Sequence, residues 1–208
     1  MDGTKRDLRK RYASARRAIP ADMAERWSFH VIRNIVSLRR ILDSKLILVY
    51  RRAGSEVNTD MLIDLIIASG RGAALPYCRE DGSMGIGRIL SPDTDLAPGA
   101  LGVMEPVAAC RDNVRPDQLD AVICPGVAFD TECGRLGRGG GYYDRFLQQV
   151  KGSAFVVGCA YDCQISETPL PRQPHDVAMD AVITEKRAFP AGVCPALAAP
   201  GGAGGERA

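Results

Sequence analysis

The chain has 208 residues, which is enough for one sizeable hydrophobic core without a second domain. Hydrophobic residues make up 46% and charged residues 25%, and the net charge is only +2, so nothing in the composition demands nucleic acid or a membrane as a partner. We see no apolar run of membrane-spanning length and no secretory leader, and we expect a cytoplasmic protein.

Two helices are predicted at the start of the chain. Thr4 and Asp7 have the spacing of a capping box, and the apolar residues after them recur every three or four positions, which predicts a helix over 4–17. Proline cannot continue a helix because it lacks a backbone N–H, so Pro20 separates this helix from a second one over 21–38.

Short apolar runs then alternate with helical patterns. The run KLILVY over 45–50 is continuously apolar, as expected for a strand of a parallel sheet that is buried on both faces. Further strands are predicted over 73–77, 84–90, 121–124, 154–159 and 181–184, further helices over 59–69 and 142–150, and a long connection over 91–116. The alternation predicts an α/β fold with a mainly parallel sheet, in which 84–90 lies near an edge.

The end of the chain differs in composition. From Pro190 onward it is mostly Ala, Pro and Gly, which bury too little apolar surface to fold. We therefore expect one folded domain over 1–189 and a disordered tail over 190–208. The seven cysteines are scattered and form no CxxC pair, and only two histidines occur, so we expect reduced thiols and no zinc site.

The segment 134–145, with the sequence GRLGRGGGYYDR, is the most informative of the chain. Five glycines and three arginines lie between a predicted strand and a predicted helix. Glycine lets backbone N–H groups approach an oxyanion, a helix start adds unpaired donors, and arginine matches phosphate geometry. The segment fits neither a P-loop nor a dinucleotide-binding fingerprint. It predicts a phosphate-binding loop, with a purely structural glycine turn as the alternative.

Basic residues gather on the first predicted helix. Lys5, Arg9 and Arg16 share one of its faces because they lie one and two turns apart. A solvated charged face or a nucleic-acid patch would explain this run. The sharper hypothesis is a second source of phosphate contacts that closes over the glycine-rich loop.

Three carboxylates are candidates for the same site. Glu56 follows the first buried strand, Asp144 opens the helix after the glycines, and Asp176 precedes the last strand. Oxygen ligands near phosphates suit Mg²⁺, which takes one or two carboxylates and completes its shell with water and phosphate oxygens. The alternatives are an ordinary loop carboxylate for Glu56 and a helix-start residue for Asp144.

Taken together, these segments resemble the 5-formyltetrahydrofolate cyclo-ligase (5,10-methenyltetrahydrofolate synthetase) family. The matching segments are 125–130 with the glycine-rich loop, the Lys5/Arg9 pair, 56–59, 102–106, 175–176 and 181–185. The resemblance implies a three-layer α/β fold with a mainly parallel sheet, of the ribose-5-phosphate isomerase/CoA-transferase-like type. It also implies an ATP- and Mg²⁺-dependent ligase that converts 5-formyltetrahydrofolate to 5,10-methenyltetrahydrofolate, ADP and phosphate through a phosphorylated formyl (imidate) intermediate.

The resemblance also implies roles for individual residues. Arg138 and Tyr142 would be catalytic, Glu56 and Tyr142 would bind the folate, and Asp144 and Asp176 would hold Mg²⁺. The residues expected to bind ATP are Lys5, Arg9, Arg135, Gly137, Arg138, Gly139, Gly140, Gly141, Tyr142 and Tyr143. Gly140 stands where some relatives carry a lysine, so one positive charge is missing from the loop.

The expected partners are small molecules, namely ATP and 5-formyltetrahydrofolate with its polyglutamates. We expect a monomer that binds neither nucleic acid nor a membrane. Three other functions remain open from the residues themselves. They are a phosphosugar isomerase on the same fold that needs no ATP, a non-catalytic folate- or nucleotide-binding relative, and an RNA-binding module built on the basic N-terminal helix.

Overall fold

A computed structural model describes residues 4–99 and 102–197. Its centre is a seven-stranded sheet in the order β12-β11-β9-β6-β1-β2-β3. The strands are β1 Leu46–Leu48, β2 Gly72–Cys78, β3 Met84–Ile89, β6 Ala121–Pro125, β9 Phe155–Cys159, β11 Ala181–Ile183 and β12 Ala188–Phe189. The inner strands run parallel, whereas β3 and β12 pair antiparallel at the two edges. The predicted α/β fold is confirmed, and so is the edge position of β3.

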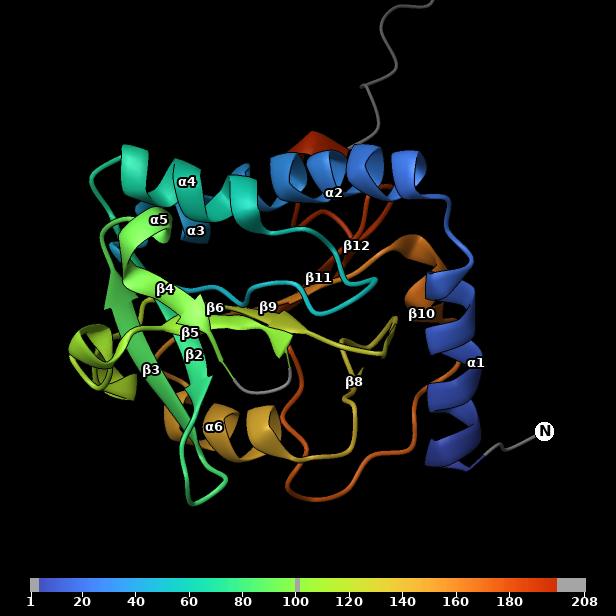
Figure 1. Ribbon diagram of the computed structural model, residues 1–208. Helices are drawn as coiled ribbons and strands as arrows, with labels where there is room; N and C mark the ends of the chain where they lie inside the picture. The colour runs from blue at the N-terminus through green and yellow to red at the C-terminus, as the bar shows by residue number, and fades with distance from the viewer. Residues whose placement is uncertain (1–3, 100–101, 198–208) are drawn as a thin grey trace, which may run out of the picture.

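Helices cover both faces of this sheet and make three layers (Figure 1). The helices are α1 Lys5–Arg17, α2 Ala21–Val36, α3 Arg39–Asp43, α4 Asp60–Ala68, α5 Pro92–Asp95 and α6 Tyr142–Val150. Helices α2, α3 and α4 pack on one face and α6 packs on the other. The helix predicted over 21–38 is α2, which ends two residues earlier at Val36, and the short helix α3 starts just beyond the predicted range at Arg39.

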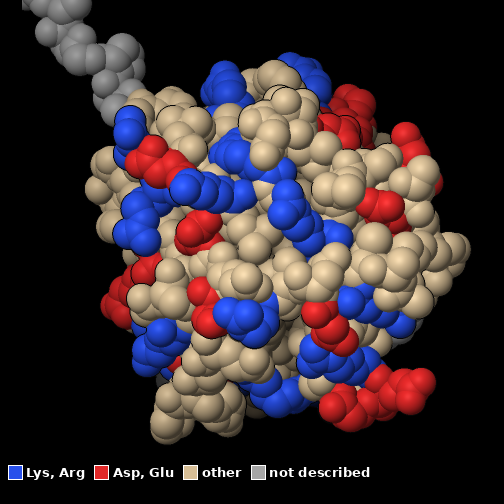
Figure 2. Space-filling view, turned by 90° about the vertical axis from the view of Figure 1, so that its left-hand side faces the viewer, with Lys and Arg blue, Asp and Glu red and all other residues tan. Residues whose placement is uncertain are grey.

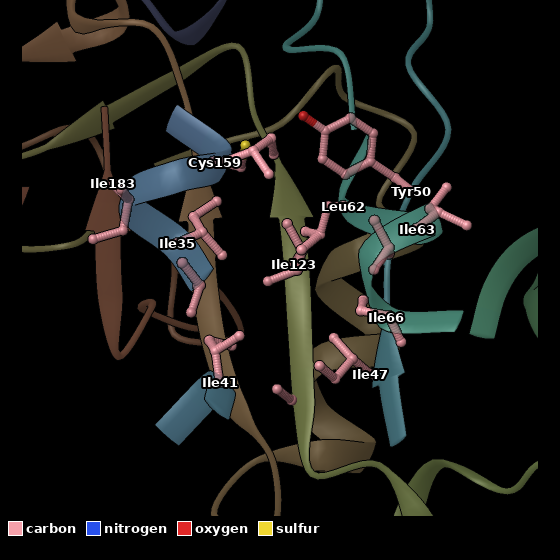
Figure 3. Close-up of a cluster of buried hydrophobic side chains, with 14 of the residues drawn as sticks. Ile35, Ile41, Ile47, Tyr50, Leu62, Ile63, Ile66, Ile123, Cys159 and Ile183 are labelled. Atoms are coloured by element: carbon pink, nitrogen blue, oxygen red, sulfur yellow. The ribbon is translucent and has the colours of Figure 1, made fainter. Parts of the chain in front are cut away.

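The larger part of the core lies under α2, α3 and α4. Ile35, Ile41 and Leu62, one from each helix, point towards Ile123 of the central strand β6, and all four side chains are fully buried (Figure 3). Burying an aliphatic side chain of this size contributes about 1.5–3 kcal/mol. This apolar contact fixes the sheet relative to helices α2, α3 and α4. It therefore also fixes the position of the strand ends that carry the site.

Short strands form two small sheets beside the main one. They are β4 Leu96–Pro98 with β5 Met104–Pro106, and β7 Ala128–Asp130 with β8 Arg135–Leu136 and β10 Ile165–Ser166. The β4–β5 hairpin lies inside the segment that was predicted to be a simple connection. Strands of two or three residues are too short to show an alternating pattern, which explains why the sequence did not predict them. Strand β8 leads directly into the glycine-rich loop.

Helix α1 lies at the carboxyl ends of the parallel strands. It packs against β7 and against the 3₁₀ helix η4 (Asp162–Gln164), which follow the carboxyl ends of β6 and β9. Thr4 caps α1 by accepting a hydrogen bond from the backbone N–H of Asp7, as the capping box predicts. The basic face of α1 is thereby brought to the sheet edge at which open α/β sheets bind ligands.

The last described residues pack against the core. Cys194 is only 1% exposed, and its Sγ lies 3.4 Å from the backbone oxygen of Asn34 in α2. The 3₁₀ helix η5 (Pro195–Leu197) follows it, after η2 (Ala108–Cys110) and η3 (Pro116–Gln118) earlier in the chain. Folded structure therefore extends past the predicted boundary at residue 189, because a small apolar thiol anchors residues 190–197. The rest of the predicted tail lies outside the described residues.

Two surface properties bear on possible partners. Among residues 4–99 and 102–197, no helix is both long and apolar enough to cross a membrane. Figure 2 shows the face opposite α1, where basic and acidic side chains are interspersed.

Candidate active site

A cavity opens at the carboxyl ends of β1, β2 and β6. Its empty space, which includes the solvent at its open mouth, amounts to about 920 Å³. One wall comes from 50–56 after β1, and a second comes from the end of β2 with Met84, Val103 and Glu105. The third wall is formed by the glycine-rich loop and the first turn of α6. The segment after β1 and the glycine-rich loop, which sequence analysis singled out, thus meet around one space.

The glycine-rich loop presents a row of backbone donors. Gly139 and Gly141 have φ angles of +105° and +69°, a region that favours glycine, and Gly141 is the N-cap of α6. The backbone N–H groups from Arg138 to Asp144 donate no hydrogen bond to any residue that the structure describes. Unpaired donors at a helix start, supported by the helix dipole, form an anion-binding site. This geometry fits a phosphate group.

Arg135 lies beneath the loop rather than in its opening. Its side chain is 4% exposed, pairs with Asp144, and donates from Nη1 to the backbone oxygen of Pro125 at 3.3 Å. Burial lowers the pKa of Arg135, but Cys124 and Asp144 outweigh this effect and raise it overall, so the guanidinium stays charged. The residue predicted to contact ATP therefore fixes Asp144 and the start of α6.

Beside Arg135, Tyr143 adds a further buried donor to the wall. Burial raises the pKa of Tyr143 well above its ordinary value, so its hydroxyl stays protonated. Within the described residues, this hydroxyl and the Nε of Arg135 are buried without a hydrogen-bond partner. Such groups are rare in native proteins and mark a place where a polar partner is missing.

Glu56 and Arg138 form an ion pair at the rim of the cavity. The carboxylate of Glu56 is 8% exposed and accepts from Arg138 Nη2 at 2.7 Å and from the backbone N–H of Ala53 at 3.0 Å. Arg138 also donates to the backbone oxygen of Ala53 at 3.0 Å. The structure therefore ties the glycine-rich loop to the segment after β1, and brings together two residues that were predicted to act on different ligands.

Arg16, which the sequence grouped with Lys5 and Arg9 on the basic face of the first helix, completes this arrangement. Its Nη1 lies 3.9 Å from Glu56 and donates to the backbone oxygen of Gly126 at 3.2 Å, while Nε donates to Ser55 Oγ at 3.1 Å. Burial lowers the pKa of Arg16 and Glu56 opposes that shift. The sequence indicated that Arg16 lies on the same helix face as Arg9. A shared face does not show, however, that the Arg16 side chain is buried beside Glu56.

Helix α1 touches the loop through Arg9 but not through Lys5. Arg9 donates from Nε to the backbone oxygen of Gly137 at 2.8 Å. Lys5 instead pairs with Asp176 at 2.9 Å, and Asp176 also accepts from the backbone N–H of Gln173 at 2.7 Å. Arg9 therefore holds the loop, whereas Lys5 connects α1 to the segment before β11.

The two carboxylates predicted to hold Mg²⁺ belong to different ion pairs. Asp144 lines the cavity and pairs with Arg135, whereas Asp176 pairs with Lys5 and is not part of the lining. In the part of the chain that the structure describes, no group of three His, Cys, Asp or Glu side chains is placed to hold a metal. Asp144 fits a Mg²⁺ that phosphate and water oxygens would otherwise surround.

The Lys5–Asp176 pair predicts how stability depends on pH. Burial raises the pKa of Asp176, but the backbone N–H of Gln173 and the charge of Lys5 outweigh it, so the folded pKa lies below the usual value. The ionised carboxylate of Asp176 therefore adds to the free energy of unfolding. This stabilisation is fully present above the unfolded pKa of about 3.9 and is lost as pH falls through the folded pKa. The free energy of unfolding of wild type should fall below about pH 4 more steeply than that of Asp176→Asn. Parallel curves for the two proteins would contradict this account.

Tyr142 also lines the cavity. The guanidinium of Arg145 lies over the Tyr142 ring, 5.5 Å from its centroid. It donates hydrogen bonds to the backbone oxygens of Gly140 at 3.3 Å and Gly82 at 3.0 Å. A Cβ added to Gly140 would lie 3.0 Å from the Tyr142 ring. A lysine at position 140 would therefore crowd Tyr142, and Arg145 supplies a positive charge beside the loop instead.

The chain matches one family over almost its whole length. The sequence model of the 5-formyltetrahydrofolate cyclo-ligase family matches residues 1–185. A 5-formyltetrahydrofolate cyclo-ligase of Mycolicibacterium smegmatis is 31% identical over 189 residues, which cover 88% of this chain and 95% of the relative. The enzyme of the same name from Escherichia coli is 29% identical over 179 residues, covering 84% and 96%.

Solved structures agree with these matches. The NMR structure of Aquifex aeolicus 5,10-methenyltetrahydrofolate synthetase superposes with a TM-score of 0.79 at 37% identity, covering 89% of this chain and 91% of the other. A 5,10-methenyltetrahydrofolate synthetase from Mycoplasma pneumoniae has the same fold, with a TM-score of 0.70 at 24% identity, covering 89% and 100%. The chain belongs to the 5-formyltetrahydrofolate cyclo-ligase family.

Proposed function

We propose that this enzyme converts 5-formyltetrahydrofolate to 5,10-methenyltetrahydrofolate while it cleaves ATP to ADP and phosphate. One observation carries the proposal beyond the family assignment. The unpaired backbone donors from Arg138 to Asp144 and the buried carboxylate of Glu56 line the same cavity. A loop that binds anions suits the phosphates of ATP, and a buried carboxylate that accepts hydrogen bonds suits the nitrogen-rich ring of the folate. The cavity would therefore hold the two side by side.

The chemistry explains why both partners must share one cavity. The formyl oxygen is a poor leaving group, and its attack on the γ-phosphorus of ATP converts it into a good one. Nitrogen 10 of the folate then attacks the phosphorylated imidate carbon, and phosphate leaves. The protein has to align the formyl oxygen with the γ-phosphorus and stabilise the charge on the moving phosphoryl group.

Named residues would perform these tasks. The backbone N–H groups of the loop would hold the phosphates, and Arg138 would stabilise the transferred group. Arg9 would keep the loop in place through its hydrogen bond to the oxygen of Gly137. Glu56 would accept N–H donors of the pterin ring, and Tyr142 would pack against the ring on the opposite side.

Mg²⁺, when bound, would neutralise phosphate charge, and Asp144 is the carboxylate that would hold it. Lys5 and Asp176 remain predicted contacts for ATP and Mg²⁺, and both would have to leave their ion pair to serve them. We further propose a cytoplasmic monomer that acts on small molecules.

One assay tests this function. The purified protein is mixed with Mg-ATP and 5-formyltetrahydrofolate, and the near-ultraviolet absorbance of the methenyl product is followed. Omitting ATP or Mg²⁺ should abolish the signal. Product formation without ATP would contradict the proposal and favour ATP-independent chemistry. Folate and nucleotide binding without turnover would favour the non-catalytic relative.

A further inference from the structure

The acidic residues that line the cavity differ in what neutralises them. Glu56 accepts a hydrogen bond from Arg138, and Asp144 pairs with Arg135. Glu105 is paired more loosely, since Nη2 of Arg111 lies 3.7 Å from its Oε2 without a hydrogen bond between them. Its side chain is 7% exposed. Glu105 is thus the least neutralised carboxylate of the cavity.

The surroundings of Glu105 offer its carboxylate few strong hydrogen-bond donors. Strand β5 holds its backbone opposite Ala97 of β4, and its Oε1 accepts only a long hydrogen bond, at 3.3 Å, from the backbone N–H of Cys78. Arg111 is fixed elsewhere, since its Nε donates to the oxygen of Pro106 at 2.9 Å and its guanidinium lies 4.6 Å above the ring of Tyr77. A buried carboxylate without a strong donor is a ready acceptor for a proton or an N–H group.

The proposed reaction requires such an acceptor. Nitrogen 10 carries a hydrogen in the substrate and none in the product. On the basis of the proposed function, we infer that Glu105 is the general base for ring closure. The lone pair of nitrogen 10 forms the new C–N bond, and the C–O bond to the phosphoryl group breaks with its electrons leaving on phosphate. The N–H proton passes to the Glu105 carboxylate, and the N–H electron pair stays on nitrogen 10.

The other groups of the cavity suit this step less well. Glu56 and Asp144 are each engaged directly by an arginine guanidinium, which occupies the carboxylate oxygens that would have to accept the proton. Cys78 also lies on this wall, but burial raises the pKa of its thiol and the charge of Glu105 raises it further. The thiol therefore stays protonated at neutral pH, and the neighbouring carboxylate is the better base.

The test separates the two halves of the reaction. In a rapid-quench experiment with Mg-ATP and 5-formyltetrahydrofolate, ADP reports phosphoryl transfer and absorbance reports ring closure. We expect Glu105→Gln to form ADP in the first turnover at close to the wild-type rate, and to form the methenyl product about 100-fold more slowly. Glu167→Gln is the matched control, because that carboxylate is exposed and pairs with Arg187 outside the cavity.

A second variant guards against a folding defect. Glu105→Ala removes the carboxylate and leaves space, so added formate should restore part of its ring-closure rate but should not accelerate wild type. Thermal unfolding and calorimetry with 5-formyltetrahydrofolate confirm that the variants fold and bind. Wild-type ring closure in Glu105→Gln, equal slowing of both steps, or weaker folate binding with unchanged turnover would each overturn the inference. Wild type that forms no methenyl product would overturn the proposed function instead.

Discussion

Replacing Arg138 with alanine should lower turnover about 100- to 1,000-fold, the usual effect of removing one well-placed donor to a developing anion. The guanidinium of Arg138 reaches across the cavity rim from the glycine-rich loop, with Nη2 2.7 Å from Glu56. Its side chain is 51% exposed, so it is free to turn from Glu56 towards a bound phosphate. The measurement is the steady-state rate of methenyl formation at saturating ATP and folate.

Related variants show whether position or charge matters. Arg138→Lys keeps the charge but loses the planar fork, so we expect only partial recovery of the rate. Arg115→Ala is the matched control, because Arg115 pairs with Asp117 on the exposed surface. Cys163→Ser, at an exposed thiol, should also have little effect. Near-normal turnover in Arg138→Ala would remove this residue from the mechanism.

Replacing Glu56 with glutamine should weaken binding of 5-formyltetrahydrofolate about 10- to 100-fold, since hydrogen bonds to a charged group contribute about 1.5–3 kcal/mol each. Glutamine preserves the size of the side chain but loses the negative charge that a ring with several N–H donors prefers. Calorimetric titration with 5-formyltetrahydrofolate measures the effect. Binding of ATP should change much less, because the backbone donors of the loop remain in place.

The same substitution carries a cost in stability. Glu56 faces both Arg138 and the buried Arg16, and losing its charge leaves Arg16 without a nearby anion. We expect a loss of about 1–3 kcal/mol in the free energy of unfolding. Glu25→Gln is the control, because Glu25 pairs with Arg52 in an exposed ion pair outside the cavity. Unchanged folate affinity in Glu56→Gln would refute the role of this carboxylate.

The sequence predicts the long elements of the fold well. The bounds of α6 (Tyr142–Val150) agree with the prediction, because glycines end immediately before a strongly amphipathic stretch. Continuous apolar runs identified the inner parallel strands within a residue or two at each end, including β1, which is shorter than the predicted 45–50. The β4–β5 hairpin was missed because a three-residue strand offers no period, and its segment is rich in turn-forming residues.

The candidate site was also predicted only in part. Parallel topology places the loops after β1 and β6 at one sheet edge, which is why the sequence indicated that Glu56 and the glycine-rich loop belong together. Glu105 was noted only within the matching segment 102–106 and received no role, because the hairpin that carries it to the cavity was not predicted. The ion pairs of Lys5 and Arg135 were also missed, since residue type and spacing do not specify which carboxylate a cation will meet.

The central claim is that a phosphoryl group passes directly from ATP, held on the glycine-rich loop, to the formyl oxygen of the folate. It is tested most directly with 5-formyltetrahydrofolate that carries oxygen-18 in its formyl group. If the claim holds, the label appears in the released inorganic phosphate, and ADP carries none. Unlabelled phosphate alongside methenyl product would show that the formyl oxygen leaves by another route, and would contradict the account.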